Sequence, residues 1–405
     1  MPVSEITLDI IREIAQPSPS KIILLVMDGL GGLPHPQTGK TELETARTPN
    51  LDRLAATGIC GLTEPVAPGI TPGSAPGHLS LFGYDPVKYT IGRGILEAVG
   101  IDFDVRRGDV AARGNFSTID EAGRVTDRRA GRLSDEKCVE LCKLLDGQTI
   151  NGVKIFVRPV REHRLVVMMR GEGLAPDVSD SDPQKTGVPP LTIIAHSPAA
   201  EKLAKVANEF LGRAKEMLAK HHPANMVLLR GFSQHPDLPT ISEIFKLKPA
   251  AIASYPMYRG LAKLVGMDVL KTGKTIEDEI QTLKQNYASY DFFFVHIKET
   301  DTAGEDGNFE AKVKVIENVD RLVPEVTALN PDVIVVAGDH STPATFKGHT
   351  WHPVPFLLYS RWCRPGDITR FSESSCASTS LGQLPATSLM VLAMANAQKL
   401  NKYGA

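Results

Sequence analysis

Cysteine is scarce in this chain of 405 residues, which contains five of them and no Cys-x-x-Cys pair. Structural zinc sites and catalytic dithiols use closely spaced pairs, and an odd number of cysteines suits reduced thiols in the cytosol. The sequence therefore favours neither a disulfide framework nor a cysteine zinc site. Cys138 and Cys142 are one helical turn apart, and we expect them to pack on a helix.

Long apolar runs and excess positive charge are also missing. No apolar run approaches the length that spans a membrane, and the N-terminus lacks a basic stretch followed by an apolar one. A net charge of −2 argues against bulk electrostatic binding to nucleic acid or to a membrane surface. We therefore expect a cytoplasmic protein with neither partner, and the sequence leaves its oligomeric state open.

Hydrophobic residues, by contrast, are plentiful at 42%, enough for substantial cores in two domains. Three stretches are apolar without alternation, which is typical of buried parallel strands: residues 21–27, 291–297 and 332–337. Residues 356–359 resemble a further strand. These stretches predict an α/β fold with a mostly parallel sheet flanked by helices.

Acidic residues follow each of the three predicted strands: Asp28, Asp301 and Asp339. Because parallel strands end at one edge of a sheet, their carboxylates would repel one another unless cations lay among them. His340 and His349 follow the last strand and add imidazole ligands. The alternative for any one acid is an ordinary turn, but the combination favours a metal site.

A Gly/Pro-rich loop precedes Ser74, which we expect in the first turn of a short helix that ends near Gly83. Unpaired backbone N–H groups and the positive end of the helix dipole would surround this hydroxyl. They are good partners for a phosphate group. The alternative is a serine that only caps the helix.

The character of the sequence changes between residues 101 and 245. Short alternating strands mix with helices near 134–145 and 199–219, which predicts an inserted α+β domain between segments 1–100 and 246–405 of the first domain. This segment is rich in arginine although the chain as a whole is not basic. The enrichment favours an anion-binding face, and a solvated surface is the alternative.

Several motifs together resemble the archaeal-type 2,3-bisphosphoglycerate-independent phosphoglycerate mutases of the alkaline phosphatase superfamily. In chain order they are Asp28-Gly29, TPN at 48–50, PGSAPGH at 72–78, GRGILEA at 92–98, DRRAGR at 127–132, GDH at 338–340 and HT at 349–350. The resemblance covers nearly the whole chain. It implies a phosphatase-like domain interrupted by a substrate-binding lid.

The resemblance also implies the chemistry. Such enzymes interconvert 3-phosphoglycerate and 2-phosphoglycerate through a phosphoserine intermediate, without added 2,3-bisphosphoglycerate. They use two divalent metal ions, for which we expect Mn²⁺, with Mg²⁺, Co²⁺ or Zn²⁺ as other options.

Individual roles follow by position in the motifs. Ser74 matches the catalytic nucleophile of the family. One ion would be held by Asp28, Ser74, Asp339 and His340, and the other by Asp301, Glu305 and His349. Glu305 stands where the family has histidine, and Gln184 also replaces a common histidine. The candidate substrate-binding residues are Arg113, Asp127, Arg129, His163, Arg164, Arg230 and Arg259.

Two other functions stay open at this point. The same metal–serine site could hydrolyse phosphate monoesters, because water can replace the reoriented substrate as the phosphoryl acceptor. The two replaced histidines could alternatively mark a relative that binds a ligand without turnover. Retention of Ser74 and of the other ligand-type residues weakens this last reading.

Overall fold

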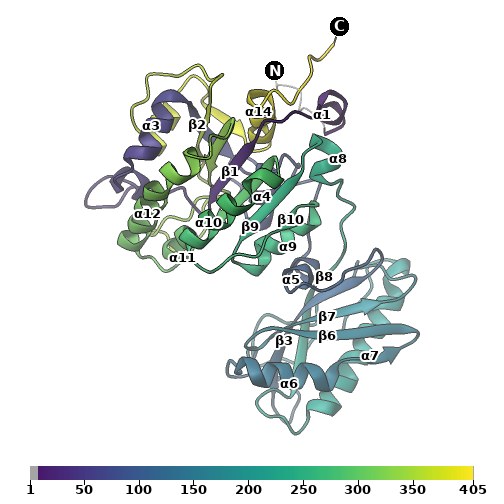
Figure 1. Ribbon diagram of the computed structural model, residues 1–405. Helices are drawn as coiled ribbons and strands as arrows, with labels where there is room; N and C mark the ends of the chain where they lie inside the picture. The colour runs from purple at the N-terminus through teal and green to yellow at the C-terminus, as the bar shows by residue number, and fades with distance from the viewer. Residues whose placement is uncertain (1–7, 405) are drawn as a thin grey trace. The chain divides into compact units, whose positions relative to one another are not determined.

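The computed structural model describes residues 8–404, which form two compact units: residues 8–90 with 238–404, and residues 91–237 (Figure 1). The inserted unit thus starts and ends earlier than the expected segment 101–245. Helix α5 (Arg93–Gly100) packs against strands β3 and β8 of the second unit, whereas α8 (Ile241–Phe245) packs against α1 (Leu8–Ile14) of the first. These tertiary contacts, rather than a change in composition, set the boundaries.

The first unit is built on a sheet of eight strands in the order β10-β9-β11-β1-β12-β13-β2-β14. At its centre, β1 (Ile22–Met27) pairs in parallel with β11 (Phe292–Ile297) and with β12 (Val333–Ala337). All residues of these three strands are buried. The predicted mostly parallel α/β sheet and its three central strands are therefore confirmed.

The outer strands complete this sheet. Beside β11, β9 and β10 continue the parallel pairing, whereas β13 runs antiparallel to both β12 and β2. Strand β14 is parallel to β2. The bounds of these strands are β2 (Ile59–Glu64), β9 (Pro249–Ala253), β10 (Asp268–Val269), β13 (Val354–Ser360) and β14 (Gln383–Pro385).

Helices cover both faces of the sheet (Figure 1). On one face, alternate strand residues such as Leu25 and Val295 pack with apolar residues of α3 (Pro49–Thr57), α10 (Ile276–Asn286) and α12 (Phe309–Thr327). On the other face, α4 (Ser74–Leu81) and α9 (Pro256–Leu264) bring aromatic rings against β11, and α14 (Ser388–Asn396) packs on β12. Short helices α2 (Glu42–Thr45) and α13 (Glu373–Ala377) follow loops, whereas α11 (Glu299–Glu305) follows β11 almost directly.

The second unit is an antiparallel sheet with two main helices. Strands β4 (Val125–Asp127), β3 (Val110–Ile119), β7 (Arg164–Arg170), β6 (Val153–Arg161) and β5 (Thr149–Ile150) lie in that order. Strand β8 (Met226–Gln234) also pairs with β3. Residues of α6 (Asp135–Leu145) and α7 (Glu201–Leu218) fill its core, which includes the thiols of α6. Among residues 8–404, no helix combines the length and apolar character that crossing a membrane requires.

Candidate active site

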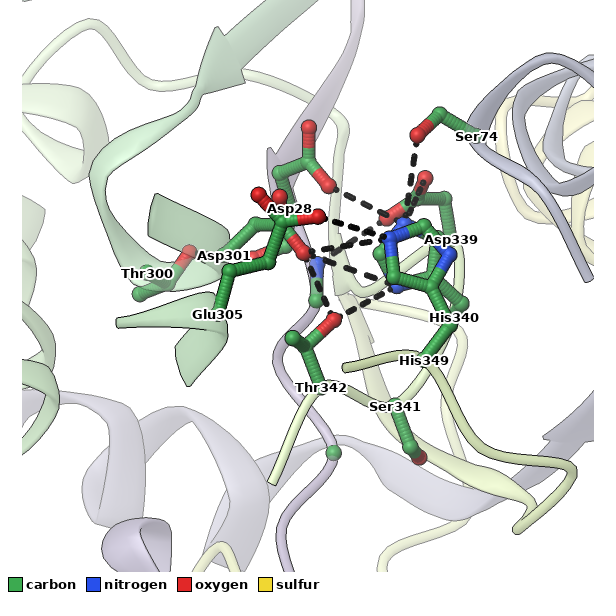
Figure 2. Close-up of polar contacts among 12 residues, drawn as sticks. Asp28, Ser74, Thr300, Asp301, Glu305, Asp339, His340, Ser341, Thr342 and His349 are labelled. Atoms are coloured by element: carbon green, nitrogen blue, oxygen red, sulfur yellow. Dashed lines mark hydrogen bonds and ion pairs between the residues drawn. The ribbon is translucent and has the colours of Figure 1, made fainter. Parts of the chain in front are cut away.

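Asp28, Asp339 and His340 meet where the two parallel strands β1 and β12 end (Figure 2). The His340 Nε2 atom lies 3.3 Å from Asp28 Oδ1 and 3.2 Å from Asp339 Oδ2, and all three side chains are fully buried. Asp28 Oδ1 accepts no hydrogen bond from the described residues, whereas Asp339 Oδ2 also lies 3.0 Å from His78 Nδ1. Two buried carboxylate oxygens beside an imidazole nitrogen are a donor set that suits a divalent cation.

A second group of ligand-type side chains consists of Asp301, His340 and His349. Asp301 lies on α11, directly after β11, and its Oδ1 atom is 3.6 Å from His349 Nε2 and 4.0 Å from His340 Nδ1. The two imidazole rings stack with centroids 3.7 Å apart. Because His340 belongs to both groups, the two candidate metal positions are adjacent.

Ser74 is the first residue of α4, as the loop before it predicted. Its Oγ atom lies 3.4 Å from His340 Nε2, so the hydroxyl faces the first group (Figure 2). Gly77 permits this approach, because a Cβ atom there would stand 2.3 Å from the carbonyl oxygen of Asp339. The helix N-terminus directs its positive end to the same place.

Glu305 lies at the rim rather than within either group. It is on α11, one turn after Asp301, as its spacing predicted, but its side chain is 55% exposed. Its Oε1 atom comes within 3.7 Å of His349 Nε2. Its role as a ligand therefore stays a prediction.

Neighbouring charges favour the ionised form of the two carboxylates in the first group. Burial raises the pKa of Asp28, but the hydrogen bond from His296 and the charges of His296, His340 and Lys298 outweigh it and hold that pKa well below its usual range. Burial and the Asp28 charge raise the pKa of Asp339, whereas His340 and His78 bring it below the ordinary value. Burial lowers the pKa of His340, which favours a neutral imidazole able to bind a cation.

Four further side chains surround this edge and were not identified from the sequence. His78 Nδ1 lies 3.0 Å from Asp339 Oδ2, and His296 Nε2 lies 3.1 Å from Asp28 Oδ2. Lys298 contacts both Asp28 and Asp301, and Tyr258 stacks on His296. His78 is part of the PGSAPGH motif, but a histidine inside the apolar strand β11 is indistinguishable from a core residue without its partner.

In the second unit, the charges of four arginines act on one partly buried carboxylate. Arg113 Nε lies 3.0 Å from Glu97 Oε1, and the charges of Arg93, Arg164 and Arg230 also act on Glu97. Burial nevertheless raises the pKa of Glu97. One carboxylate among four guanidinium groups leaves an excess of positive charge, which suits an anion.

The other candidate substrate-binding residues have different surroundings. Asp127 accepts hydrogen bonds from the backbone N–H groups of Arg129 and Gly131 and so shapes the turn after β4. His163 is buried beside the charges of Arg164, Arg129 and Arg113. Arg259 lies on α9 in the first unit. The structure thus brings Arg113, Arg164 and Arg230 together and places Arg259 on a separate unit.

The buried imidazole of His163 predicts a loss of stability in mild acid. Burial, followed by the Arg164 charge, lowers its pKa to about 4, whereas an unfolded histidine titrates near 6.5. The unfolded chain therefore binds the extra proton first, so this contribution to stability is lost as the pH falls from about 6.5 to 4. We expect His163→Phe to reduce the drop in melting temperature between pH 7 and pH 5. The exposed-site variant His196→Asn should behave like the wild type, and an unchanged drop in His163→Phe would contradict the prediction.

The fold and the site define a class of α/β proteins that place a serine hydroxyl beside clustered metal-ligand residues. The family model described as 2,3-bisphosphoglycerate-independent phosphoglycerate mutase matches residues 55–225. A protein of Thermosipho africanus named as a probable mutase of this kind is 53% identical over 98% of both chains. A similarly named protein of Thermus thermophilus is 51% identical over 98% of this chain and 99% of its own.

Solved structures agree with these sequence matches. A cofactor-independent phosphoglycerate mutase from Thermoplasma acidophilum is 33% identical, with a TM-score of 0.76 over 93% of this chain and 100% of its own. A Pyrococcus horikoshii protein is 29% identical, with a TM-score of 0.82 over 95% of this chain and 99% of its own. The chain belongs to the 2,3-bisphosphoglycerate-independent phosphoglycerate mutase family, as the motifs indicated.

Proposed function

We propose that this protein is a phosphoglycerate mutase that interconverts 3-phosphoglycerate and 2-phosphoglycerate, with Ser74 as the phosphoryl carrier. Family membership supports the reaction, because relatives more than 50% identical over nearly their full length carry this name. The single observation that supports the mechanism is the position of Ser74 Oγ, 3.4 Å from His340 Nε2 at the edge where the buried carboxylates meet.

Two divalent ions would be held at this edge, one by Asp28, Ser74, Asp339 and His340, the other by Asp301, His349 and Glu305. When bound, such ions lower the pKa of a coordinated hydroxyl and neutralise charge on a transferring phosphoryl group. The two groups of ligand-type side chains, which share His340, lie within one unit and support this proposal. We propose Mn²⁺ as the working ion.

The protein's own residues would stabilise the negative charge of a phosphoryl group on Ser74. The N-terminus of α4 offers backbone N–H groups and a positive dipole end to an anion on Ser74 Oγ. Lys298 contacts Asp28 and Asp301, and the charges of these carboxylates raise its pKa against the effect of burial. It therefore stays a cation and adds positive charge beside Asp28 and Asp301.

The arginine group of the second unit would bind the substrate's own negative charges. Phosphoglycerate carries a carboxylate and a phosphate, and guanidinium groups bind both in a bidentate manner. Arg113, Arg164 and Arg230 already lie around Glu97, so their side chains are partly oriented before substrate arrives. Retaining glycerate during its reorientation would further require that water be kept out.

An assay that couples 2-phosphoglycerate production to enolase, with inorganic phosphate measured in parallel, tests the proposed function. Starting from 3-phosphoglycerate, we expect isomerisation to exceed phosphate release by orders of magnitude. Phosphate release alone would identify a phosphomonoesterase instead. Neither product under a panel of divalent ions would favour a ligand-binding relative without turnover.

Glu305 is expected to contribute to metal binding despite its position at the rim. It follows Asp301 by one helical turn, which lets both carboxylates reach the same side of α11. Glu305→Gln should raise the Mn²⁺ concentration needed for half-maximal activity by about tenfold. This is the lower end of the range of affinity losses seen when residues around a metal site are mutated. Asp306→Asn, at the next residue, is the matched control. An equal change in the required Mn²⁺ concentration in the two variants would show that Glu305 is not a metal ligand.

A further inference from the structure

Lys312 is a fully buried lysine in the first turn of α12. Its ammonium group donates hydrogen bonds to three backbone carbonyl oxygens: Gly29 O at 2.8 Å, Gly31 O at 3.0 Å and Thr342 O at 2.8 Å. None of these three partners is a carboxylate. The group thus binds the loop that follows β1 and the loop that follows β12 at the same time.

The position of Lys312 does not stabilise helix α12. A positive charge in the first turn opposes the helix dipole, and burial of an ammonium group is unfavourable. The charges of Glu42, Glu373, Asp301 and Asp28 act in the opposite direction, as do three charge-assisted hydrogen bonds. The placement of Lys312 is therefore explained by the two loops that it joins.

These two loops carry the candidate metal ligands. Gly29 directly follows Asp28, and its N–H group donates to Asp339 Oδ1 at 3.0 Å. The Thr342 N–H group donates to Gly29 O and Gly31 O, the same carbonyl oxygens that Lys312 binds. Lys312 therefore reinforces a direct contact between the two loops.

Thr342 extends this connection to the second group of ligands. Its Oγ1 atom donates to Asp301 Oδ1 at 2.6 Å and lies 2.9 Å from His340 Nδ1 (Figure 2). Through the Thr342 backbone, Lys312 is thus connected to Asp301 and His340. Through the Gly29 backbone, it is connected to Asp28 and Asp339.

We propose that Lys312 is a positioning residue that orients both groups of metal ligands and thereby sets the affinity of the site for divalent cations. This inference rests on the proposed metal site. Because its side chain is fully buried and binds backbone carbonyls of the two loops, Lys312 would act on the ligands rather than on the substrate. Its three hydrogen bonds join the two loops, and the ligands are consequently ordered before a metal ion arrives.

Lys399 provides a matched control. It is also fully buried in the first unit, and its ammonium group binds Ser18 O at 2.7 Å and Asp291 Oδ2 at 3.2 Å. Asp291 immediately precedes β11, so this contact lies at the opposite end of the strands from the ligands. Loss of a buried ammonium should destabilise the protein at either position, but only position 312 joins the ligand loops.

The test compares Lys312→Met and Lys399→Met in the full-length protein after removal of metal. Mn²⁺ binding is measured by titration calorimetry at a temperature at which circular dichroism shows both variants folded. We expect the Kd for Mn²⁺ to rise at least about tenfold in Lys312→Met and less than about twofold in Lys399→Met. Melting temperatures should fall in both.

If Lys312→Met does not fold, Lys312→Gln is compared with Lys399→Met instead. The shorter amide side chain can still donate to one or two of the carbonyls. The Kd of Lys312→Gln should then lie between those of the wild type and the expected Met variant. Wild-type Mn²⁺ affinity in either folded Lys312 variant would overturn the inference. Failure of the wild type itself to bind divalent cations would instead refute the proposed metal site.

Discussion

Replacement of Ser74 by alanine is expected to lower the rate of 3-phosphoglycerate isomerisation by at least about 10³-fold. The hydroxyl is the proposed phosphoryl carrier, and no covalent route remains without it. Its position supports this role, because Ser74 begins α4 and its Oγ atom faces His340 Nε2 at 3.4 Å. The enolase-coupled assay measures the loss.

Ser80→Ala is the matched control on the same helix. Ser80 is buried and donates to the carbonyl oxygen of Pro65, away from the ligand groups, so its loss should lower stability and leave turnover within a few-fold of the wild type. Mass spectrometry of the wild type quenched with substrate should show one phosphoryl group on the peptide containing Ser74. Wild-type turnover in Ser74→Ala would contradict the proposed mechanism.

Removal of divalent metal is expected to abolish turnover completely and reversibly. Asp28 and Asp339 are fully buried, and each has a carboxylate oxygen within 3.3 Å of His340 Nε2. Without a cation, these carboxylates would repel the negatively charged phosphoryl group. Treatment with EDTA followed by dialysis should therefore remove activity, and added Mn²⁺ should restore it.

The accompanying control is addition of 2,3-bisphosphoglycerate. Because Ser74 would carry the phosphoryl group, the bisphosphate should not raise the rate of the metal-loaded protein and should not rescue the metal-depleted protein. Circular dichroism before and after depletion separates loss of metal from unfolding. Full activity in chelator, or an absolute requirement for the bisphosphate, is incompatible with the proposed site.

Local signals in the sequence were enough for much of the fold. Strands β1, β11 and β12 could be predicted because residues buried on both faces of a sheet are apolar without alternation. The start of α4 at Ser74 and the left-handed Gly83 beyond its end also follow from local backbone preferences. Asp28, Asp301 and Asp339 could be recognised because each directly or closely follows such a strand.

Tertiary structure alone decided which buried polar groups act together. The antiparallel direction of β13, the place of His340 in both ligand groups and the partners of His296 and Lys312 depend on contacts between distant segments. Lys312, for example, binds a carbonyl 283 residues away in sequence. A buried charge is stable only where specific partners offset its loss of water, and those partners are brought together by the packing of the whole unit.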